Sequence, residues 1–278
     1  MPNIHPTAII DDQVTLADDV QIGPFCVLNG DITLGAGVHL IASVHMQGPL
    51  TVGAGSVFYP GSSMGFGPQD IKVKYGDPTA GVVIGDECVF RESSSVHAAS
   101  NEHTPTRIGD RAFFMVNTHV GHDVQMGTDV VLVVGAGVGG HAEIQDRVIL
   151  AGGTMVHHFG RVGRQAMASG LTVLSNDLPP YFLAAERNTV VGLNLVGMRR
   201  SGMSRDEINA VRSAYSEVFR KNPPMQEMRE MLAERAKESK GVDDIYQFIL
   251  KSKRAICPVG GRRLSRTTEH QSRADAGV

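Results

Sequence analysis

Histidines gather in one part of the chain, where His119 and His122 flank a Val-Gly pair and Asp123 follows directly. An imidazole titrates near neutral pH, so His122, oriented by the Asp123 carboxylate, could remove a proton from a hydroxyl group. Neighbouring residues of a strand point to opposite faces, so this pairing requires a turn. Neutral imidazole is also a good zinc ligand. This segment therefore has three interpretations: its histidines provide a catalytic base, they bind a metal ion, or they are solvated surface residues.

A six-residue period indicates the elements that hold these residues. Apolar residues stand at every sixth position from Ile4 to Met64, from Ile84 to Val96, and from Ile108 to Leu174. Glycine often follows the apolar residue, where we expect it to relieve the backbone at a tight turn. Three six-residue sides would form one triangular coil, with coils stacked ~4.8 Å apart. The period predicts a parallel β-helix rather than a sandwich, whose strands recur every ~8–12 residues.

Coil stacking would bring the histidines to one edge of this β-helix. His122, Gly140 and His158 follow one another at intervals of three repeats, which is one coil. Three more histidines stand close by in the sequence: His119 beside Val120, His141 beside Gly140, and His157 beside His158. The five histidines would lie within roughly 10 Å of one another at the ordinary strand spacing. Gly140, between the two coils, could offer a bare N–H group to a developing oxyanion.

Two segments interrupt the repeat, and a different pattern replaces it later. Residues 65–83 shift the phase by two residues, whereas residues 98–106 leave it intact. Long excursions of this kind are usually functional. We expect a β-helix over residues 1–192 with these two loops, a helical domain over 193–256, and a disordered, arginine-rich tail over 257–278.

Helical signals support this division. Ser204 and Glu207 form a capping box, followed by apolar residues at helical spacing. We expect a further helix to start at Asp243 or Asp244.

Composition excludes several classes of protein. The chain has 278 residues, 32 of them glycine, no tryptophan and 5% aromatic residues, as expected of a thin solenoid. A net charge of −3 gives no electrostatic reason to expect nucleic-acid binding. Without a signal peptide or an apolar run of membrane-spanning length, we expect a cytoplasmic protein with no stable membrane insertion. The 3 scattered cysteines form neither a disulfide framework nor a metal knuckle.

Motifs outside the repeat carry a family resemblance. They are His-Pro-Thr-Ala-Ile at 5–9, Ile-Gly-Pro-Phe-Cys at 22–26, Gln-Asp at 69–70, Arg-Glu-Ser at 91–93, Asn-Thr-His-Val-Gly-His-Asp at 117–123, Gly-His at 140–141, Asp-Leu-Pro-Pro-Tyr at 177–181, Gly-Leu-Asn at 192–194 and Arg-Arg at 199–200. In this order the set resembles the bacterial UDP-N-acetylglucosamine acyltransferases of lipid A biosynthesis, over roughly residues 4–254. The resemblance implies a left-handed β-helix and a homotrimer with its sites between subunits.

The resemblance also implies a reaction. His122 would be the general base on the 3-hydroxyl of UDP-N-acetylglucosamine, which attacks the thioester of a 3-hydroxyacyl chain carried on the phosphopantetheine of acyl carrier protein. Asp123 would orient His122, the Gly140 N–H would serve the oxyanion, and no metal or other cofactor would take part. The implied substrate-binding residues are Gln69, Asp70, Lys72, Lys74, His97, His119, His141, His157, His158, Asn194, Arg199 and Arg200. Gly170, with Met167, would set the acyl length.

Some positions depart from the family pattern. His158 stands where the family usually has Gln, Val196 where it has Glu, and Ala98 where it often has a basic residue. His158 and Val196 leave open transfer to a 3-amino sugar nucleotide. A zinc-dependent enzyme of the carbonic-anhydrase type and a non-catalytic scaffold that binds acyl carrier protein also stay open.

Overall fold

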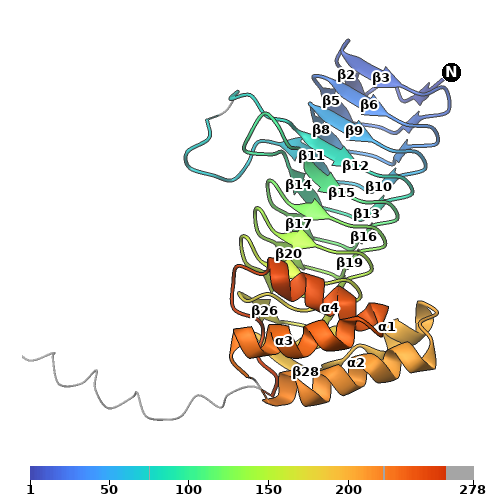
Figure 1. The fold of residues 1–278 in the computed structure, drawn as a ribbon. Helices are drawn as coiled ribbons and strands as arrows, with labels where there is room; N and C mark the ends of the chain where they lie inside the picture. Colours follow the sequence, from blue (N-terminus) through green and yellow to red (C-terminus); the bar gives the residue numbers. More distant parts are fainter. Residues whose placement is uncertain (75, 222, 261–278) are drawn as a thin grey trace, which may run out of the picture.

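The computed structural model describes residues 1–74, 76–221 and 223–260. The chain forms a left-handed parallel β-helix, with short helices packed at its C-terminal end (Figure 1). The predicted fold class is therefore confirmed.

Three sheets form the faces of the β-helix, and their strands are parallel except for β28 at the end of sheet A. Sheet A contains β1 (Asn3–Ile4), β4 (Gln21–Ile22), β7 (His39–Leu40), β10 (Val57–Phe58), β13 (Val89–Phe90), β16 (Phe113–Phe114), β19 (Val131–Leu132), β22 (Ile149–Leu150), β25 (Met167–Ala168), β27 (Phe182–Ala185) and β28 (Thr189–Leu193). Sheet B contains β2 (Ile9–Ile10), β5 (Val27–Asn29), β8 (His45–Gln47), β11 (Ser63–Phe66), β14 (Ser95–His97), β17 (His119–Val120), β20 (Gly137–Val138), β23 (Met155–Val156) and β26 (Val173–Leu174). Sheet C contains β3 (Val14–Leu16), β6 (Ile32–Leu34), β9 (Leu50–Val52), β12 (Val82–Ile84), β15 (Thr106–Ile108), β18 (Gln125–Met126), β21 (Glu143–Ile144) and β24 (Arg161–Val162).

The register of the sheets confirms the predicted repeat. His119 pairs with Gly137, three repeats later, and Gly137 pairs with Met155 after the same interval. Two coils are longer, because Phe58 pairs with Phe90 and Phe90 with Phe114. These registers accommodate the two interruptions, with the predicted phase shift after the first and none after the second. In Figure 1 the chain between β11 and β12 projects away from the β-helix.

A large apolar side chain fills the core on each side of a coil, and a smaller residue two positions before it is often buried as well, as with Val130 and Leu132. Leu28, Phe58, Phe90 and Leu132 are at most 1% exposed. The rings of Phe58 and Phe90 stack with centroids 4.8 Å apart, the spacing of neighbouring strands. Burying such a side chain contributes roughly 1.5–3 kcal/mol, so the stack supplies much of the stability of a thin solenoid.

The corners combine left-handed residues with close contacts between coils. Asn117, Asp123 and Asp129, six residues apart, all have a φ between 57° and 62°. Glycine is required after the strands for a different reason from the one expected, which was relief of the backbone at a tight turn. A Cβ at Gly23 would lie 1.8 Å from the carbonyl oxygen of Ile41, so glycine is needed there for close approach of the next coil.

An antiparallel hairpin and short helices close the C-terminal end. The hairpin joins β27 and β28. The helices are α1 (Leu195–Arg200), α2 (Arg205–Glu217), the 3₁₀ helix η1 (Phe219–Lys221), α3 (Met225–Ala236) and α4 (Lys240–Lys251). No helix in the described part of the chain is long and apolar enough to span a membrane.

Side-chain caps define the helix starts. The Ser204 side chain caps α2 as predicted, but the Glu207 carboxylate binds Ser239 Oγ and Gly241 N instead of closing the capping box. The expected start of the last helix at Asp243 or Asp244 is wrong. That helix begins at Lys240, because Ser239 accepts a hydrogen bond from Val242 N and serves as the N-cap.

Residues after α4 return to the β-helix. Cys257 N donates to Asp177 O, and Val259 pairs with Val190. The expected disorder from Cys257 onward is therefore wrong for residues 257–260, whose backbone groups pair with the hairpin and with Asp177. Residues 261–278 of the expected tail lie outside the described residues.

Candidate active site

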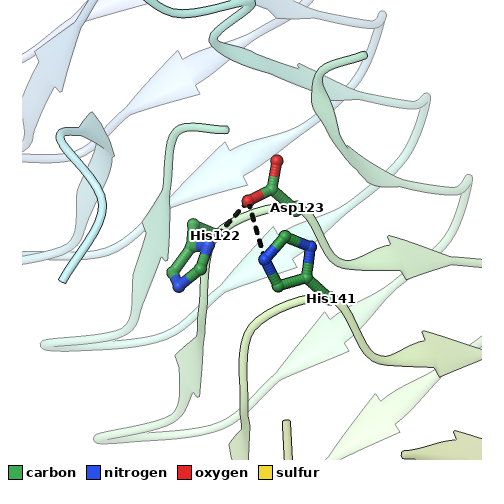
Figure 2. Close-up of side chains that lie close together, drawn as sticks. All are labelled: His122, Asp123 and His141. Carbon is green, nitrogen blue, oxygen red and sulfur yellow. Dashed lines mark hydrogen bonds and ion pairs between the residues drawn. The ribbon is translucent and has the colours of Figure 1, made fainter. Parts of the chain in front are cut away.

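His122 and Asp123 lie at a corner between sheets B and C and contact each other (Figure 2). Asp123 has a φ of 62°, and this left-handed turn allows two successive side chains to meet. His122 Nδ1 lies 2.6 Å from Asp123 Oδ2. The two residues are only 6% and 8% exposed. The sequence required a turn here, and the structure contains it.

The loop between β14 and β15 holds the Asp123 carboxylate. Ser100 donates to it from its backbone N and, at 2.6 Å, from its hydroxyl. Asn101 Nδ2 donates at 2.7 Å, and the Asp123 N–H donates to Thr106 Oγ1. Ser100, Asn101 and Thr106 were not identified from the sequence. The only signal for them was that the loop interrupts the repeat just before the histidine-rich corner.

These contacts favour the ionised form of Asp123. Burial would raise the pKa of Asp123, but hydrogen bonds from Ser100 and His122 outweigh it and keep that pKa below its ordinary value. An ionised carboxylate only accepts hydrogen bonds, so the neutral His122 ring carries its hydrogen on Nδ1. Its Nε2 is then a free acceptor, which is the state that a general base requires.

Gly140 lies one coil further along, directly against His122. A Cβ at Gly140 would lie 2.6 Å from His122 Nε2, so any larger residue would displace the imidazole. In the described part of the chain, no acceptor takes a hydrogen bond from the Gly140 N–H. That amide is therefore available to a ligand oxygen beside His122.

The His122 ring borders a cavity of about 360 Å³, which we call the His122 cavity. Its lining is Gln69, His119, Gly121, His122, Val138, Gly139, Gly140, Met155, Val156, His157, His158 and Val173. The structure thus brings together Gln69, His119, His122, Gly140, His157 and His158 from the predicted site.

His141 lies behind this cavity rather than in its lining. Its Nε2 is 3.6 Å from Asp123 Oδ2, and its ring stacks on Phe159 with centroids 4.5 Å apart. Figure 2 shows His141 and His122 on either side of the shared carboxylate. His141 is therefore placed to support Asp123.

His97 and His119 favour the neutral form. Desolvation, with His119 and His122 nearby, lowers the pKa of His97 to about 4. Desolvation, with His122 nearby, also lowers the pKa of His119, whose Nδ1 lies 2.9 Å from Ser95 Oγ. His97 lies beside His119, with ring centroids 5.0 Å apart.

Several predicted residues lie outside the His122 cavity. Asp70 accepts a hydrogen bond from the Lys72 backbone, and the Lys72 and Lys74 side chains are exposed on the projecting loop. Gly170 occupies the corner after β25, where an added Cβ would meet only Gly152 O, at 3.5 Å.

A second cavity, of about 800 Å³, lies on sheet A and contains further predicted residues. We call it the Asn194 cavity; its lining includes Met167, Asn194, Val196 and Arg200. The Asn194 side chain caps α1 through Gly197 N and donates to Gln165 O, so it also has a structural role. Arg199 lies apart from both cavities, beside Arg205 and Arg212.

One group of side chains has the spacing of a metal site. The ligand atoms of His122, Asp123 and His141 all lie within 4.8 Å of one another. The Asp123 carboxylate, however, already accepts hydrogen bonds from Ser100, Asn101 and His122. A metal ion held between His122 Nδ1 and Asp123 would have to replace the direct 2.6 Å contact between them, so the arrangement fits an imidazole oriented by the carboxylate.

Comparisons with known proteins identify a family. Residues 177–257 match the family described as Udp N-acetylglucosamine O-acyltransferase, Domain 2. An acyl-[acyl-carrier-protein]–UDP-N-acetylglucosamine O-acyltransferase from Janthinobacterium sp. is 39% identical, over 92% of this chain and 99% of its own length. The enzyme of the same name from Aliarcobacter butzleri is 41% identical, over 92% and 98%.

Solved structures give the same result. The UDP-N-acetylglucosamine acyltransferase from Francisella novicida has a TM-score of 0.88 and 32% identity, over 92% of this chain and 94% of that one. The UDP-N-acetylglucosamine O-acyltransferase from Moraxella catarrhalis has a TM-score of 0.87 and 33% identity, over 91% and 99%. This chain belongs to the family of acyl-[acyl-carrier-protein]–UDP-N-acetylglucosamine O-acyltransferases.

Proposed function

We propose that this enzyme transfers a 3-hydroxyacyl chain from acyl carrier protein to the 3-hydroxyl of UDP-N-acetylglucosamine, the first step of lipid A biosynthesis. The observation that carries the proposal is the state of His122. Its Nδ1 is held by the Asp123 carboxylate at 2.6 Å, and its Nε2 borders a cavity beside the Gly140 N–H. The names of the relatives supply the donor and the acceptor.

In this mechanism His122 Nε2 takes the proton of the sugar 3-hydroxyl while the oxygen attacks the thioester carbonyl. Asp123 stabilises the imidazolium that forms. The Gly140 N–H donates to the oxyanion of the tetrahedral intermediate. Collapse of the intermediate breaks the carbon–sulfur bond. The departing phosphopantetheine thiolate then takes from His122 the proton that came from the sugar hydroxyl. The acyl group passes directly from sulfur to oxygen, so we propose neither a metal nor a covalent enzyme intermediate.

We further propose that the working enzyme is a homotrimer with each site between two subunits. The His122 cavity is built on sheet B and the Asn194 cavity on sheet A, so one copy presents them on different faces. A neighbouring copy could bring its Asn194 cavity to the His122 cavity. There Arg200 would bind the anionic diphosphate of the nucleotide sugar, for which a guanidinium is well suited.

The acyl chain and the sugar need different surroundings. Met155, which is exposed, and the half-buried Val173 give the His122 cavity an apolar surface on which a hydrocarbon chain could lie. Gly170, with open space where a side chain would project, supports the proposal that this corner limits acyl length. We also propose that the reaction takes place in the cytoplasm, with acyl carrier protein as a dissociable partner.

A specific observation keeps one more acceptor in view. His158 lines the His122 cavity and Val196 lines the Asn194 cavity, and both depart from the family pattern. These two changes fall on residues that would surround the acceptor rather than on the base. A 3-amino sugar nucleotide is therefore the second candidate acceptor.

A transfer assay with a panel of 3-hydroxyacyl carrier proteins tests the proposal. UDP-N-acetylglucosamine and its 3-amino analogue compete in the same reaction, and mass spectrometry separates the ester from the amide product. We expect the ester to dominate with at least one chain length. Dominant amide would reject the proposed acceptor, and no product from either would favour a carrier-binding scaffold. Elemental analysis of the active enzyme tests the zinc hypothesis, which stoichiometric metal would support.

A further inference from the structure

The corners that carry the active site are joined by a column of backbone hydrogen bonds. His141 N donates to His122 O at 2.9 Å, and one coil later Phe159 N donates to Gly140 O at 3.0 Å. By the same spacing, Asp177 N should donate to His158 O in the next coil. The Asp177 N–H donates to Ala255 O instead.

A shortened corner explains this break. Val156 pairs with Leu174, three full repeats later, but Val162 pairs with Leu178, two residues short of that interval. The corner after β26 is thus two residues shorter than the corner beneath it. In the described part of the chain, no backbone amide donates to His158 O.

Arg254 supplies the missing donor. Its Nη1 lies 2.6 Å from His158 O, and His157 Nδ1 lies 3.0 Å from the same oxygen. A hydrogen bond from a guanidinium to a carbonyl oxygen is charge-assisted, and it is stronger than the hydrogen bond from a backbone N–H that it replaces. Because a carbonyl oxygen only accepts, neutral His157 carries its hydrogen on Nδ1 and presents Nε2 as an acceptor.

The segment that carries Arg254 is itself fixed. We call residues 252–260 the return segment, because they run from α4 back to the β-helix. Ala255 O accepts from Asp177 N, Cys257 N donates to Asp177 O, and Gly260 N donates to Val190 O. Arg254 therefore projects from an anchored backbone to the end of the active-site column.

We infer that Arg254 is a positioning residue for acyl transfer. It completes the column of hydrogen bonds that joins the corners at His122, Gly140 and His158. In this way it fixes the His157–His158 wall of the cavity, opposite the base. The inference rests on the proposed function for its kinetic consequence. The ring centroids of His122 and His158 lie 6.3 Å apart, so movement of this corner changes the width of the cavity at the reacting atoms. Misplacement by about 1 Å can lower a rate roughly 100-fold.

The kinetic test compares Arg254→Ala with Lys253→Ala, a change at the neighbouring residue on the same segment. We expect Arg254→Ala to lower kcat roughly 10-fold to 100-fold with an unchanged melting temperature, and Lys253→Ala to behave as wild type. Added guanidinium should restore part of the loss in Arg254→Ala only. Wild-type kcat and KM in Arg254→Ala would overturn the inference. A fall in kcat that guanidinium does not reverse, together with a matching fall in the melting temperature, would also overturn it.

A conservative variant keeps the inference testable if Arg254→Ala does not fold. Arg254→Lys keeps a cationic donor but lacks the planar fork of the guanidinium. Its kcat should lie between those of wild type and Arg254→Ala. If Arg254→Ala does not fold, a wild-type kcat in both Arg254→Lys and Arg254→Gln overturns the inference, because glutamine lacks the charge and the reach.

The His158→Gln background separates the carbonyl from the imidazole. Arg254 contacts the backbone oxygen, so Arg254→Ala should lower kcat by the same factor in His158→Gln as in wild type. If the loss disappears in that background, Arg254 acts through the His158 ring, and the column has no role in positioning.

A measurement that needs no turnover separates the positioning role of Arg254 from the proposed acyl-transfer function. Burial lowers the pKa of His158, and His157, His122, His141 and Arg254 lower it further. NMR titration of the imidazoles should therefore show a higher His158 pKa in Arg254→Ala, with amide shifts at residues 157–160. Such changes without transfer activity in wild type would reject the proposed reaction but support the contact. An unchanged corner would reject the positioning role.

Discussion

The His122 cavity and the Asn194 cavity use the same scaffold in different ways. The first lies where corners and a loop interrupt the repeat, and its polar groups are held in place by Ser100 and Asn101. The second lies on the regular face of sheet A, where strand side chains and α1 form apolar walls. The comparison indicates that interruptions of the repeat orient reactive groups, whereas the regular face provides area for binding.

Charge separates the two cavities further. His97, His119 and His158 have lowered pKa values, mainly because of desolvation, so these three imidazoles favour the neutral form. The Asn194 cavity instead contains Arg200 and Arg147, the latter 3.6 Å from Asp129. A base needs neutral imidazole, and a diphosphate needs cations. The two cavities therefore suit two stages of one reaction.

The largest effect is expected at the base. His122→Ala should lower turnover by roughly 10²–10⁴, the usual contribution of a general base, because the imidazole that takes the proton is removed. The measurement is kcat with saturating substrates. His103→Ala, at an exposed loop histidine, is the matched control. Unchanged turnover in His122→Ala would remove the assigned role.

A slightly smaller effect is expected at Gly140. In Gly140→Ala the new Cβ would lie 2.6 Å from His122 Nε2, so the imidazole must move away from the substrate. We expect kcat to fall roughly 100-fold, as for other small misplacements of catalytic groups. Gly192→Ala is the control, because its Cβ would meet nothing within 4 Å. Equal kcat values for the two variants would contradict the proposed geometry.

On the binding side, the effect should appear in KM. Arg200→Ala should raise KM for the acceptor roughly 10-fold, the contribution of one charge-assisted hydrogen bond, and leave kcat nearly unchanged. The control is Arg187→Ala, at an exposed arginine of the hairpin. A fall in kcat without a change in KM would assign Arg200 to the chemistry and remove the distinction between the cavities.

The smallest effect concerns stability against pH. His97 has its pKa lowered to about 4 in the folded protein, below the unfolded value, so the unfolded chain binds the extra proton first. Its stabilising contribution is complete above about pH 6.5 and is lost as pH falls toward 4. His97→Gln should reduce the acid-induced fall in melting temperature by about a few degrees. Identical melting curves across this range would exclude the buried neutral state.

Much of the fold could be predicted because the repeat is local and strict. Apolar residues at every sixth position predict the stacking that places His122, Gly140 and His158 in register. The short helix α1 was missed, since six residues capped by Asn194 carry little periodicity. The start of α4 was misplaced because its N-cap, Ser239, is recognisable only with Glu207 beside it.

The site was predictable at its corner but not around it. His122 and Asp123 are adjacent in sequence, so only the turn had to be supplied by the fold. The hydrogen bonds of Ser100 and Asn101 to Asp123 depend on the path of a loop, and Arg254 reaches His158 from 96 residues away. Contacts of this kind carry no period, so no pattern along the chain connects them.

Subunit complementation tests the central claim that the two cavities combine into one site. His122→Ala and Arg200→Glu, each inactive at low acceptor concentration, would be co-expressed with different tags and the mixed oligomers purified. If each site joins His122 of one subunit to Arg200 of its neighbour, every mixed trimer contains one intact site, so about a third of its sites should be active. Recovery near that level would support the account. Mixed oligomers as inactive as either parent would show that both residues must come from one chain, which contradicts it.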